Sequence, residues 1–141
     1  WVLNVIYTRM NPAAVLVGEV VGPEALQFLK ATCLGRKAMT TIHGGTVEEA
    51  LMRLEQLALA SAPELGLPAV RSMVSMGVDV VALMGRVHRA GRVERSLQAI
   101  AVVNGLDEDG EYKLDFLYRA QSEQANQILG QAYQNLAGVG A

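Results

Sequence analysis

The chain reads Pro12-Ala-Ala-Val-Leu-Val-Gly-Glu19, and further along it reads Thr40-Thr-Ile-His43. The first stretch holds a continuous apolar run of the kind found in buried parallel strands. The second lies in a run from Ala38 to Ile42 that is rich in β-branched residues, which favour strands. Each predicted strand ends in a polar side chain. Because parallel strands present their carboxyl ends at one edge of a sheet, we expect Glu19 and His43 to meet there, an arrangement suited to nucleotide chemistry.

Helical patterns lie around and between these strands. An apolar stripe over 2–6 ends at Asn11-Pro12, because the residue before a proline disfavours helical geometry. A second helix is predicted from Pro23 to about Cys33, and a third over 46–60, opened by a threonine and a glutamate in a capping box. After a loop with two prolines, a short helix is predicted over 69–76. This order of elements indicates an α/β layer with a parallel sheet.

Three later runs are predicted to be strands, at Val78–Met84, Arg92–Val103 and Glu111–Phe116. They are separated by His88–Gly91 and by the acidic, glycine-ended segment Asp107–Gly110, which is typical of a hairpin turn. Consecutive strands joined by tight turns pair antiparallel. The predicted fold class is therefore α/β, with flanking helices and an antiparallel extension at one edge of the parallel sheet.

Length and composition bound the class of protein. With 141 residues, of which 51% are hydrophobic, the chain can bury one ordinary core, so a single domain or a large piece of one is expected. The net charge is −2, and the 12 Lys and Arg residues are spread along the chain. Because neutralising nucleic-acid phosphates needs clustered cations, this composition argues against a nucleic-acid surface.

Cysteine usage and hydropathy indicate the cellular setting. Cys33 is the only cysteine, which excludes an internal disulfide, argues against a cysteine-based zinc site and favours a reducing, cytoplasmic setting. No apolar run reaches the roughly 20 residues that span a bilayer, since Glu19, Asp79 and Arg86 interrupt the most apolar segments. No basic region precedes an apolar stretch at the start, so no secretory signal is predicted.

The two ends of the chain carry separate expectations. The chain opens at Trp1, inside what reads as the middle of an amphipathic segment, and we expect further residues upstream. At the other end, apolar residues at approximate helix spacing predict a terminal helix over 118–136. Its polar face is rich in Gln and Asn, so this helix is marginal, and 137–141 reads as a frayed tail.

Glu19 comes directly after a buried strand, and Gly18 before it allows another group to approach the backbone closely. In that crevice an acid can orient a water for attack on a γ-phosphate, or hold Mg²⁺ through a water. The alternative is an acid that caps the next helix or faces solvent, because a single short motif predicts function loosely.

His43 follows Thr40 and Thr41 at the end of the next strand. An imidazole there could donate a hydrogen bond to a terminal phosphate and report whether a nucleotide is present. A lone histidine is more often a structural hydrogen-bonding residue. His88, in an arginine-rich turn, has only that second interpretation.

An ordered set of motifs runs through the chain, in the sequence Arg9-Met-Asn-Pro12, Val15-Leu-Val-Gly-Glu19, Gly22-Pro-Glu-Ala-Leu26, Thr40-Thr-Ile-His43, Glu49-Ala-Leu-Met-Arg-Leu-Glu55, Val78-Asp-Val-Val81, Gly91-Arg-Val93 and Val102-Val-Asn-Gly105. In order and spacing, this set resembles the second half of the type II/IV secretion-system ATPases, closest to the CpaF/TadA-type pilus assembly branch. The order is far more specific than any one motif. The resemblance implies that 1–119 is the C-terminal part of a RecA-like ATPase domain, with 120–141 as a terminal helix and tail.

The resemblance also implies a hexameric ring with ATP bound between neighbouring subunits and Mg²⁺ held indirectly. Gly18 and Glu19 would close the Walker B segment, with Glu19 as the catalytic or water-orienting acid that also holds the metal through water. His43 would be the His-box residue near the γ-phosphate, with Thr41 beside it. Arg9 aligns with an arginine of the family motif and is expected at the nucleotide.

Further family features concern contacts outside the nucleotide site. Arg53 and Arg92 match family arginines that are either structural or part of a subunit contact. The implied partner is an inner-membrane secretion or pilus platform protein, which would keep the cytoplasmic motor peripheral to that membrane. The implied function is ATP hydrolysis that powers pilus assembly or the secretion of protein or DNA, without direct sequence-specific nucleic-acid contact.

The chain departs from the family pattern at several places. Ala13 stands where an acidic residue is usual, and Val21 replaces an arginine. Leu34-Gly35-Arg36 stands for a Thr-Gly-His turn, and Gly44-Gly45 for the usual Ala-Asn. These replacements remove polar groups that could bind a nucleotide or a neighbouring subunit, and they suit a degenerate member as well as an active one.

The chain contains no phosphate-binding loop of the form G-x-x-x-x-G-K-[ST]. In the family this loop lies upstream of the segment where the chain begins, so tight ATP binding is not expected from these residues alone. Three hypotheses stay open: a portion of a motor ATPase, a non-catalytic interaction module that retains the fold for ring or membrane-partner packing, and an unrelated α/β ligand-binding domain in which Glu19 and His43 never converge.

Overall fold

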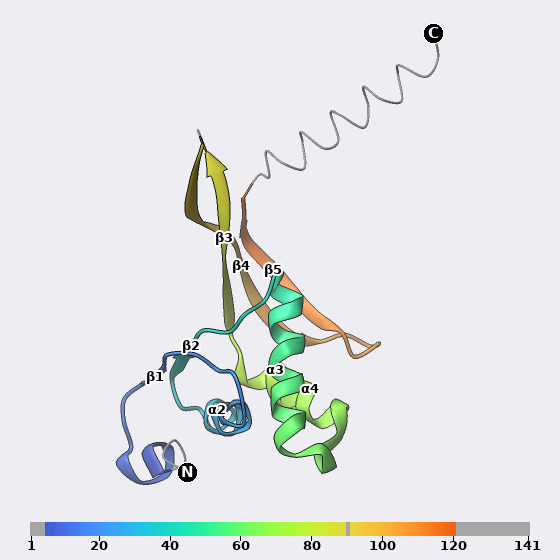
Figure 1. Ribbon diagram of the computed structural model, residues 1–141. Coiled ribbons are helices and arrows are strands. Elements are labelled where there is room, and N and C mark those ends of the chain that lie inside the picture. Colours follow the sequence, from blue (N-terminus) through green and yellow to red (C-terminus); the bar gives the residue numbers. More distant parts are fainter. Residues whose placement is uncertain (1–4, 90, 121–141) are drawn as a thin grey trace.

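The computed structural model describes residues 5–89 and 91–120 (Figure 1). Its first element is η1 (Ile6–Met10), a short π-helix that ends at Asn11. Asn11 has a left-handed backbone with φ of 45°, a conformation that asparagine tolerates better than most residues. The predicted helix end before Pro12 is therefore confirmed. The beginning of that helix lies outside the described residues, as does most of the terminal helix and tail predicted over 118–141.

Two short parallel strands follow, β1 (Val15–Val17) and β2 (Ala38–Thr40), with Val15 opposite Ala38 in the register. The crossover between them is α2 (Glu24–Cys33), as a parallel pair requires. Glu24 accepts hydrogen bonds from the backbone N–H groups of Val21 and Gly22, which lowers the pKa of its carboxyl. This carboxylate satisfies donors at the start of the helix. The predicted strand, helix, strand order is confirmed, but the predicted burial of these strands is wrong, since Leu16 is 74% exposed and Met39 64%.

Two helices pack beside α2. The first, α3 (Val47–Ser61), opens with the predicted cap, in which Thr46 Oγ1 accepts a hydrogen bond from the Glu49 N–H at 3.1 Å. A 3₁₀ turn, η2 (Pro63–Leu65), leads into α4 (Gly66–Gly77). The predicted start of this helix at residue 69 was therefore late. Pro68 lies in the first turn of α4, where a missing backbone N–H costs nothing.

The last three strands form a three-stranded antiparallel sheet in the order β3 (Val80–Arg89), β4 (Arg92–Leu106) and β5 (Tyr112–Arg119). The antiparallel pairing and the turn at Asp107–Gly110 are confirmed, and each strand ends later than predicted. Because β5 runs to Arg119, the predicted start of the terminal helix at Tyr118 is wrong. Within residues 5–89 and 91–120 this sheet is separate from the β1–β2 sheet, whereas the sequence predicted an extension at its edge. Helices α3 and α4 intervene in the chain between β2 and β3, and no ladder joins the two strands.

The core lies where the three helices meet the lower part of the antiparallel sheet (Figure 1). The sheet contributes one face, through Ala99, Ala101 and Val103, and the helices contribute apolar stripes at helical spacing. The largest fully buried side chains are Val20, Leu29, Val47, Leu51, Val70 and Val74. Among the described helices, none has the length and apolar content needed to cross a membrane.

Candidate functional site

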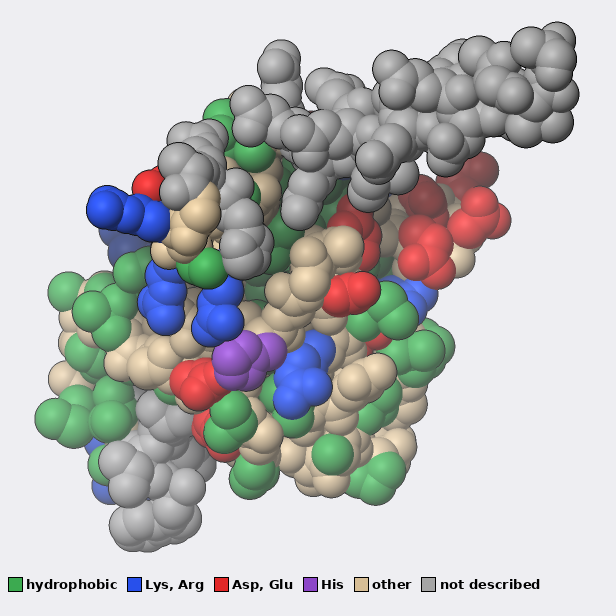
Figure 2. All heavy atoms as spheres, turned by 45° about the horizontal axis from the view of Figure 1, so that its top comes forward, with side chains coloured by type: hydrophobic (Ala, Val, Ile, Leu, Met, Phe, Trp, Pro, Cys, Tyr) green, Lys and Arg blue, Asp and Glu red, His purple; other side chains and the backbone are tan. Residues whose placement is uncertain are grey.

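Glu19 and His43 lie in contact at the carboxyl ends of β1 and β2. The distance from His43 Nε2 to Glu19 Oε1 is 2.7 Å, although both side chains are exposed, the imidazole to 81%. Figure 2 shows a histidine at the surface, bordered by acidic and basic side chains. Because an exposed contact between polar side chains contributes little to stability, the interest of this pair lies in its chemistry. It places an acid and an imidazole where one small ligand can reach both.

The backbone around this pair is held together beyond the end of the strand ladder. Thr41 Oγ1 donates a hydrogen bond to the Gly18 carbonyl at 2.7 Å, and the Val20 N–H donates to the Thr41 carbonyl at 2.9 Å. The two bonds bracket Glu19 on one segment, and Thr41 lies two residues before His43 on the other. The predicted site residues Gly18, Glu19, Thr41 and His43 are therefore neighbours in the fold.

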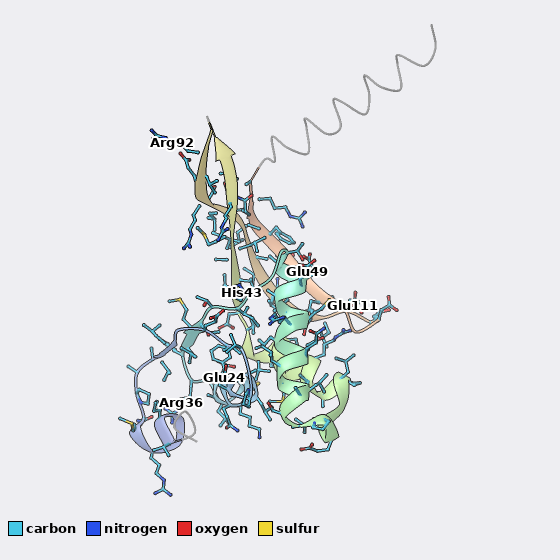
Figure 3. All side chains as sticks on the ribbon, in the orientation of Figure 1. Glu24, Arg36, His43, Glu49, Arg92 and Glu111 are labelled. Atoms are coloured by element: carbon cyan, nitrogen blue, oxygen red, sulfur yellow. The ribbon has the colours of Figure 1, made fainter. Side chains whose placement is uncertain are left out.

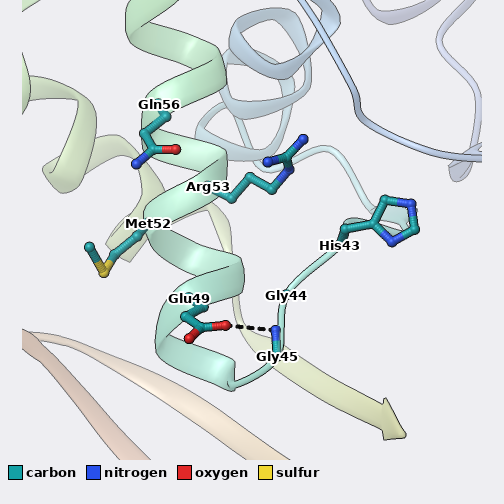
Figure 4. Close-up of a pocket in the computed structure, with 7 residues that line it drawn as sticks. All are labelled: His43, Gly44, Gly45, Glu49, Met52, Arg53 and Gln56. Carbon is teal, nitrogen blue, oxygen red and sulfur yellow. Dashed lines mark hydrogen bonds between the residues drawn. The ribbon is translucent and has the colours of Figure 1, made fainter. Parts of the chain in front are cut away.

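A pocket of about 570 Å³ opens beside His43, between the loop after β2 and the exposed side of α3. Its lining comprises His43, Gly44, Gly45, Glu49, Met52, Arg53 and Gln56. Figure 4 shows Arg53 extending from α3 toward the side of the pocket where His43 lies. The Gly45 N–H donates to Glu49 Oε2 at 2.8 Å, which fastens the loop to the first turn of the helix.

Gly44 explains part of this loop's shape. A Cβ built on Gly44 would lie 2.8 Å from the Ala50 backbone nitrogen, closer than real Cβ contacts, so the loop packs against α3 without room for a side chain. At Gly18 the opposite holds, since a Cβ there would meet nothing within 4 Å. The open space over Gly18 is accessible to a ligand, whereas the space over Gly44 is filled by the protein itself.

The remaining predicted site residues lie apart from the Glu19–His43 pair. Arg9 is exposed in the last turn of η1, and no hydrogen bond or ion pair within residues 5–89 and 91–120 joins it to either residue. Arg92 lies at the tip of the β3–β4 hairpin, far from His43 in Figure 3. Arg36 donates to Asn11 Oδ1. The structure thus brings Arg53 toward the pair and leaves the other arginines elsewhere.

The described residues hold no group of three or more His, Cys, Asp or Glu side chains suited to a metal. Glu19 lies two residues past the end of β1. Mg²⁺ is commonly bound by one or two carboxylates together with waters and substrate phosphates, so Glu19 fits a metal that arrives with a phosphate rather than one held by the protein alone.

A second cavity, an open groove of about 910 Å³, separates the two sheets. Consecutive residues line it from both sides: 38–40 along β2 and 80–84 along β3. Each strand is hydrogen-bonded to a partner on one side only within the described part of the chain, β2 to β1 and β3 to β4. Consecutive lining residues are what a strand edge presents, so the groove lies between two open strand edges.

A buried polar cluster that the sequence did not predict joins α3, α4 and β5. Glu55 is 3% exposed, and its Oε1 accepts hydrogen bonds from Arg71 Nε at 2.8 Å and from the Tyr112 hydroxyl at 2.5 Å. Arg71 also donates to the Gly110 carbonyl and to Glu111. Burial, and then the hydrogen bond to Glu55, raise the pKa of Tyr112 well above its usual range. The sequence signal that could have indicated this cluster is the position of Glu55 among the apolar residues of the buried face of α3.

The chain is similar in sequence to known secretion and conjugal transfer proteins. Residues 5–129 match the family described as Type II/IV secretion system protein. The chain is 33% identical over 98 residues to the probable conjugal transfer protein TrbB of Sinorhizobium fredii (strain NBRC 101917 / NGR234), a match that covers 69% of the chain and 29% of that protein. It is 32% identical over 90 residues to the type IV secretion system protein PtlH of Bordetella pertussis, covering 62% of the chain and 26% of that protein.

The fold has a counterpart among solved structures. The crystal structure of the VirB11 ATPase from the Brucella suis type IV secretion system, in complex with sulphate, superposes with a TM-score of 0.65 at 25% identity. The match covers 72% of the chain and 32% of VirB11. The chain therefore spans less than a third of the length of each of these three proteins.

Proposed function

Since this chain belongs to the type II/IV secretion system protein family, we propose that it forms part of an ATPase that powers secretion. The observation that carries the proposal is the 2.7 Å contact between His43 and Glu19 at the carboxyl ends of two parallel strands. In open α/β sheets ligands bind at this edge. The match to the VirB11 ATPase supports the same reading of the fold.

In the proposed reaction Glu19 would orient the water that attacks the γ-phosphate of ATP, so that the bond to the β-γ bridging oxygen breaks and ADP leaves. The same carboxylate would hold Mg²⁺ through a second water. His43 donates a hydrogen bond from Nε2 either to Glu19 or to the γ-phosphate. When a phosphate takes that hydrogen bond, the Glu19 carboxylate is free to accept one from the water. Gly18 leaves space for the nucleotide, and Thr41 holds the two segments in register through its bond to the Gly18 carbonyl.

Two arginines complete the proposed nucleotide site. Arg53 extends toward the His43 side of its pocket, where a guanidinium would neutralise phosphate charge or meet a neighbouring subunit. Arg9 keeps its predicted role at the nucleotide. That role requires the exposed η1 to approach the site in the assembled protein.

The phosphate-binding loop is proposed to enter through the groove between β2 and β3. A strand placed there would find an open edge on each side, and it would join the two described sheets into one. Its carboxyl end, if parallel to β2, would lie beside His43. We assign this strand and its loop to the part of the protein outside this chain, since the chain spans less than a third of its relatives.

The assembly is proposed to be a homo-oligomeric ring, hexameric as the sequence analysis predicted, with ATP between subunits and Arg92 at a subunit contact. It is proposed to act in the cytoplasm, bound to the inner membrane through a secretion platform protein. The names of TrbB and PtlH, for conjugal transfer and type IV secretion, support the secretion branch. The CpaF/TadA-type pilus assembly branch stays a prediction from the sequence.

The non-catalytic module is the second candidate, and two observations favour it. Arg36 stands where the resemblance implies a histidine, and its guanidinium binds Asn11. Gly44 has no side chain to offer a ligand, and its close packing on α3 leaves no room for one. Under this proposal the chain does not hydrolyse ATP, and its fold serves only to pack against other subunits of a ring or against a membrane partner protein. The third hypothesis, an unrelated domain with Glu19 and His43 apart, is wrong, because the two side chains are in contact.

The test is ATP turnover by the full-length protein. Glu19→Gln is expected to reduce the turnover rate by about 100-fold or more, because it removes the base while keeping the shape of the side chain. Glu48→Gln, an exposed glutamate in the first turn of α3, is the matched control and should leave the rate unchanged. No turnover by the wild-type protein, with ring assembly intact, would instead favour the non-catalytic module.

A further inference from the structure

Charge is segregated at the two ends of the antiparallel sheet. The hairpin segment 84–96 contains four arginines and one glutamate, although the chain as a whole has a net charge of −2. The turn segment 107–111 contains four acidic residues and no cation. Figure 3 shows the two ends apart, with Arg92 at the tip of the hairpin and Glu111 beside the turn.

The basic end places like charges directly opposite each other. Arg86 pairs with Arg95 across the β3–β4 ladder, so both side chains leave the same face of the sheet, and both are exposed. Cross-strand pairs of like charge destabilise a sheet. Within residues 5–89 and 91–120 neither arginine forms an ion pair. Val93 lies next to them with 58% of its surface exposed. This end has the character of a surface that meets an anionic partner.

The acidic end is an ordered turn rather than a loose loop. Asp107 Oδ1 accepts hydrogen bonds from the backbone N–H groups of Asp109 and Glu111. Arg71 fixes the end of the turn through the Gly110 carbonyl and Glu111. The side chains of Glu108 and Asp109 are exposed and take no part in these bonds. The turn therefore presents two carboxylates at a fixed position.

The two ends cannot neutralise each other within one molecule. Strand β4 runs from one to the other over 15 residues, a length of about 50 Å at roughly 3.3 Å per residue. The Debye length at physiological salt is about 8 Å, so an attraction over that distance is screened. The opposite charges can act on each other only between two molecules.

We propose that the arginine face of the β3–β4 hairpin, Arg86 and Arg95, docks on the acidic turn at Glu108 and Asp109 of a second copy of this chain. The contact is head to tail, since it joins different surfaces of two identical subunits. Repeated, such a contact closes into a ring or grows as a filament. The proposal rests on the ring assembly of the proposed function, for which it names one subunit contact.

The test exchanges the charges of the two surfaces in the full-length protein. One variant carries Arg86→Glu and Arg95→Glu, so that both ends of its sheet are acidic. The other carries Glu108→Lys and Asp109→Lys, so that both are basic. Each variant alone is expected to lose association by about tenfold at low salt, measured by sedimentation velocity without ATP. An equimolar mixture should regain it, because the acidic hairpin of one variant then faces the basic turn of the other.

The control is Lys30→Glu with Lys37→Glu, which changes the net charge as much as the first variant at exposed positions elsewhere. It should associate like the wild type, and at about 1 M salt, where the Debye length is about 3 Å, all differences should shrink. Far-UV circular dichroism of each variant verifies folding. If both single variants associate normally, or if the mixture is no better than either alone, the proposal is wrong.

Two further measurements distinguish this subunit contact from membrane binding by the arginine face and from the ATPase proposal. Loss of binding to vesicles with anionic lipid in the Arg86→Glu, Arg95→Glu variant, together with unchanged self-association, would assign the arginine face to a membrane and overturn the proposal. Failure of the ATPase proposal shows instead as absence of turnover in the wild-type protein. Rescue by mixing is measured without nucleotide and does not depend on turnover.

Discussion

Replacing Glu55 by leucine is expected to destabilise the protein more than any single change at the exposed Glu19–His43 pair. Glu55 is 3% exposed, and one of its oxygens accepts hydrogen bonds from both Arg71 and Tyr112. Glu55→Leu keeps the apolar volume but removes that acceptor. Two donors are then left facing a leucine, one of them charged, at the junction of α3, α4 and β5.

The magnitude follows from what each donor retains. Breaking a buried ion pair by removing one partner costs about 3–5 kcal/mol. Arg71 keeps the Gly110 carbonyl and Glu111, and its side chain is 18% exposed, so the lower value of about 3 kcal/mol is expected. Tyr112→Phe removes one donor from a carboxylate that still has Arg71, and should cost about 1.5 kcal/mol. The double variant should cost about 3 kcal/mol rather than the sum, because no tyrosine hydroxyl is then left without an acceptor.

The assay is urea unfolding of the four proteins in this cycle, followed by far-UV circular dichroism. Tyr118→Phe is the matched control, since Tyr118 is 44% exposed and its hydroxyl makes no hydrogen bond within the described residues. The reasoning is refuted if Glu55→Leu is as stable as the wild type, or if the costs of Glu55→Leu and Tyr112→Phe simply add. Either result would mean that the shared oxygen does not couple the helices to the sheet.

Three further changes have expected outcomes. The pKa of Tyr112 is raised in the folded state above its ordinary value of 10.0, so the stability of the protein should be constant below pH 10 and fall as the pH rises above it. Unfolding measured from pH 8 to 11 should show this fall in the wild type and a flatter curve in Tyr112→Phe. Gly44→Ala should cost about 1–3 kcal/mol because its Cβ meets the Ala50 backbone, while Gly18→Ala, with open space, should stay within about 0.5 kcal/mol in the same denaturation assay. Thr46→Ala should lower stability by about 1 kcal/mol through loss of the cap on α3, against little change for Ser61→Ala at the other end of the helix; equal losses would exclude a capping effect.

Local signals were sufficient for most of the individual elements of the fold. The apolar run at Val15–Val17, the capping threonine at Thr46 and the acidic turn at Asp107–Gly110 each act within a few residues, and each produced a correct prediction. The start of α4 was missed because proline was taken as a loop signal, although Pro68 lies in the first turn of that helix. The antiparallel strands were predicted but not their separation from the parallel sheet, since that depends on which edges remain open across the whole fold.

The candidate site was predictable for the same reason as the strands. Glu19 and His43 follow adjacent parallel strands, so local pattern and one rule of sheet geometry were enough to expect them together. The Glu55 cluster could not be predicted in this way, because Tyr112 lies 57 residues further along the chain and no motif links them. Whether Glu19 and His43 act on a nucleotide stays a prediction that the turnover assay will test.

The two hydrogen bonds that join the segments after β1 and β2 have a mechanical consequence. The Thr41 hydroxyl donates to the Gly18 carbonyl, and the Thr41 carbonyl accepts from the Val20 N–H. The segment that carries His43 is therefore bonded at two points to the segment that carries Glu19. A movement of the His43 segment would therefore have to stretch these bonds or carry the Glu19 segment with it, and Val20 in that segment belongs to the core.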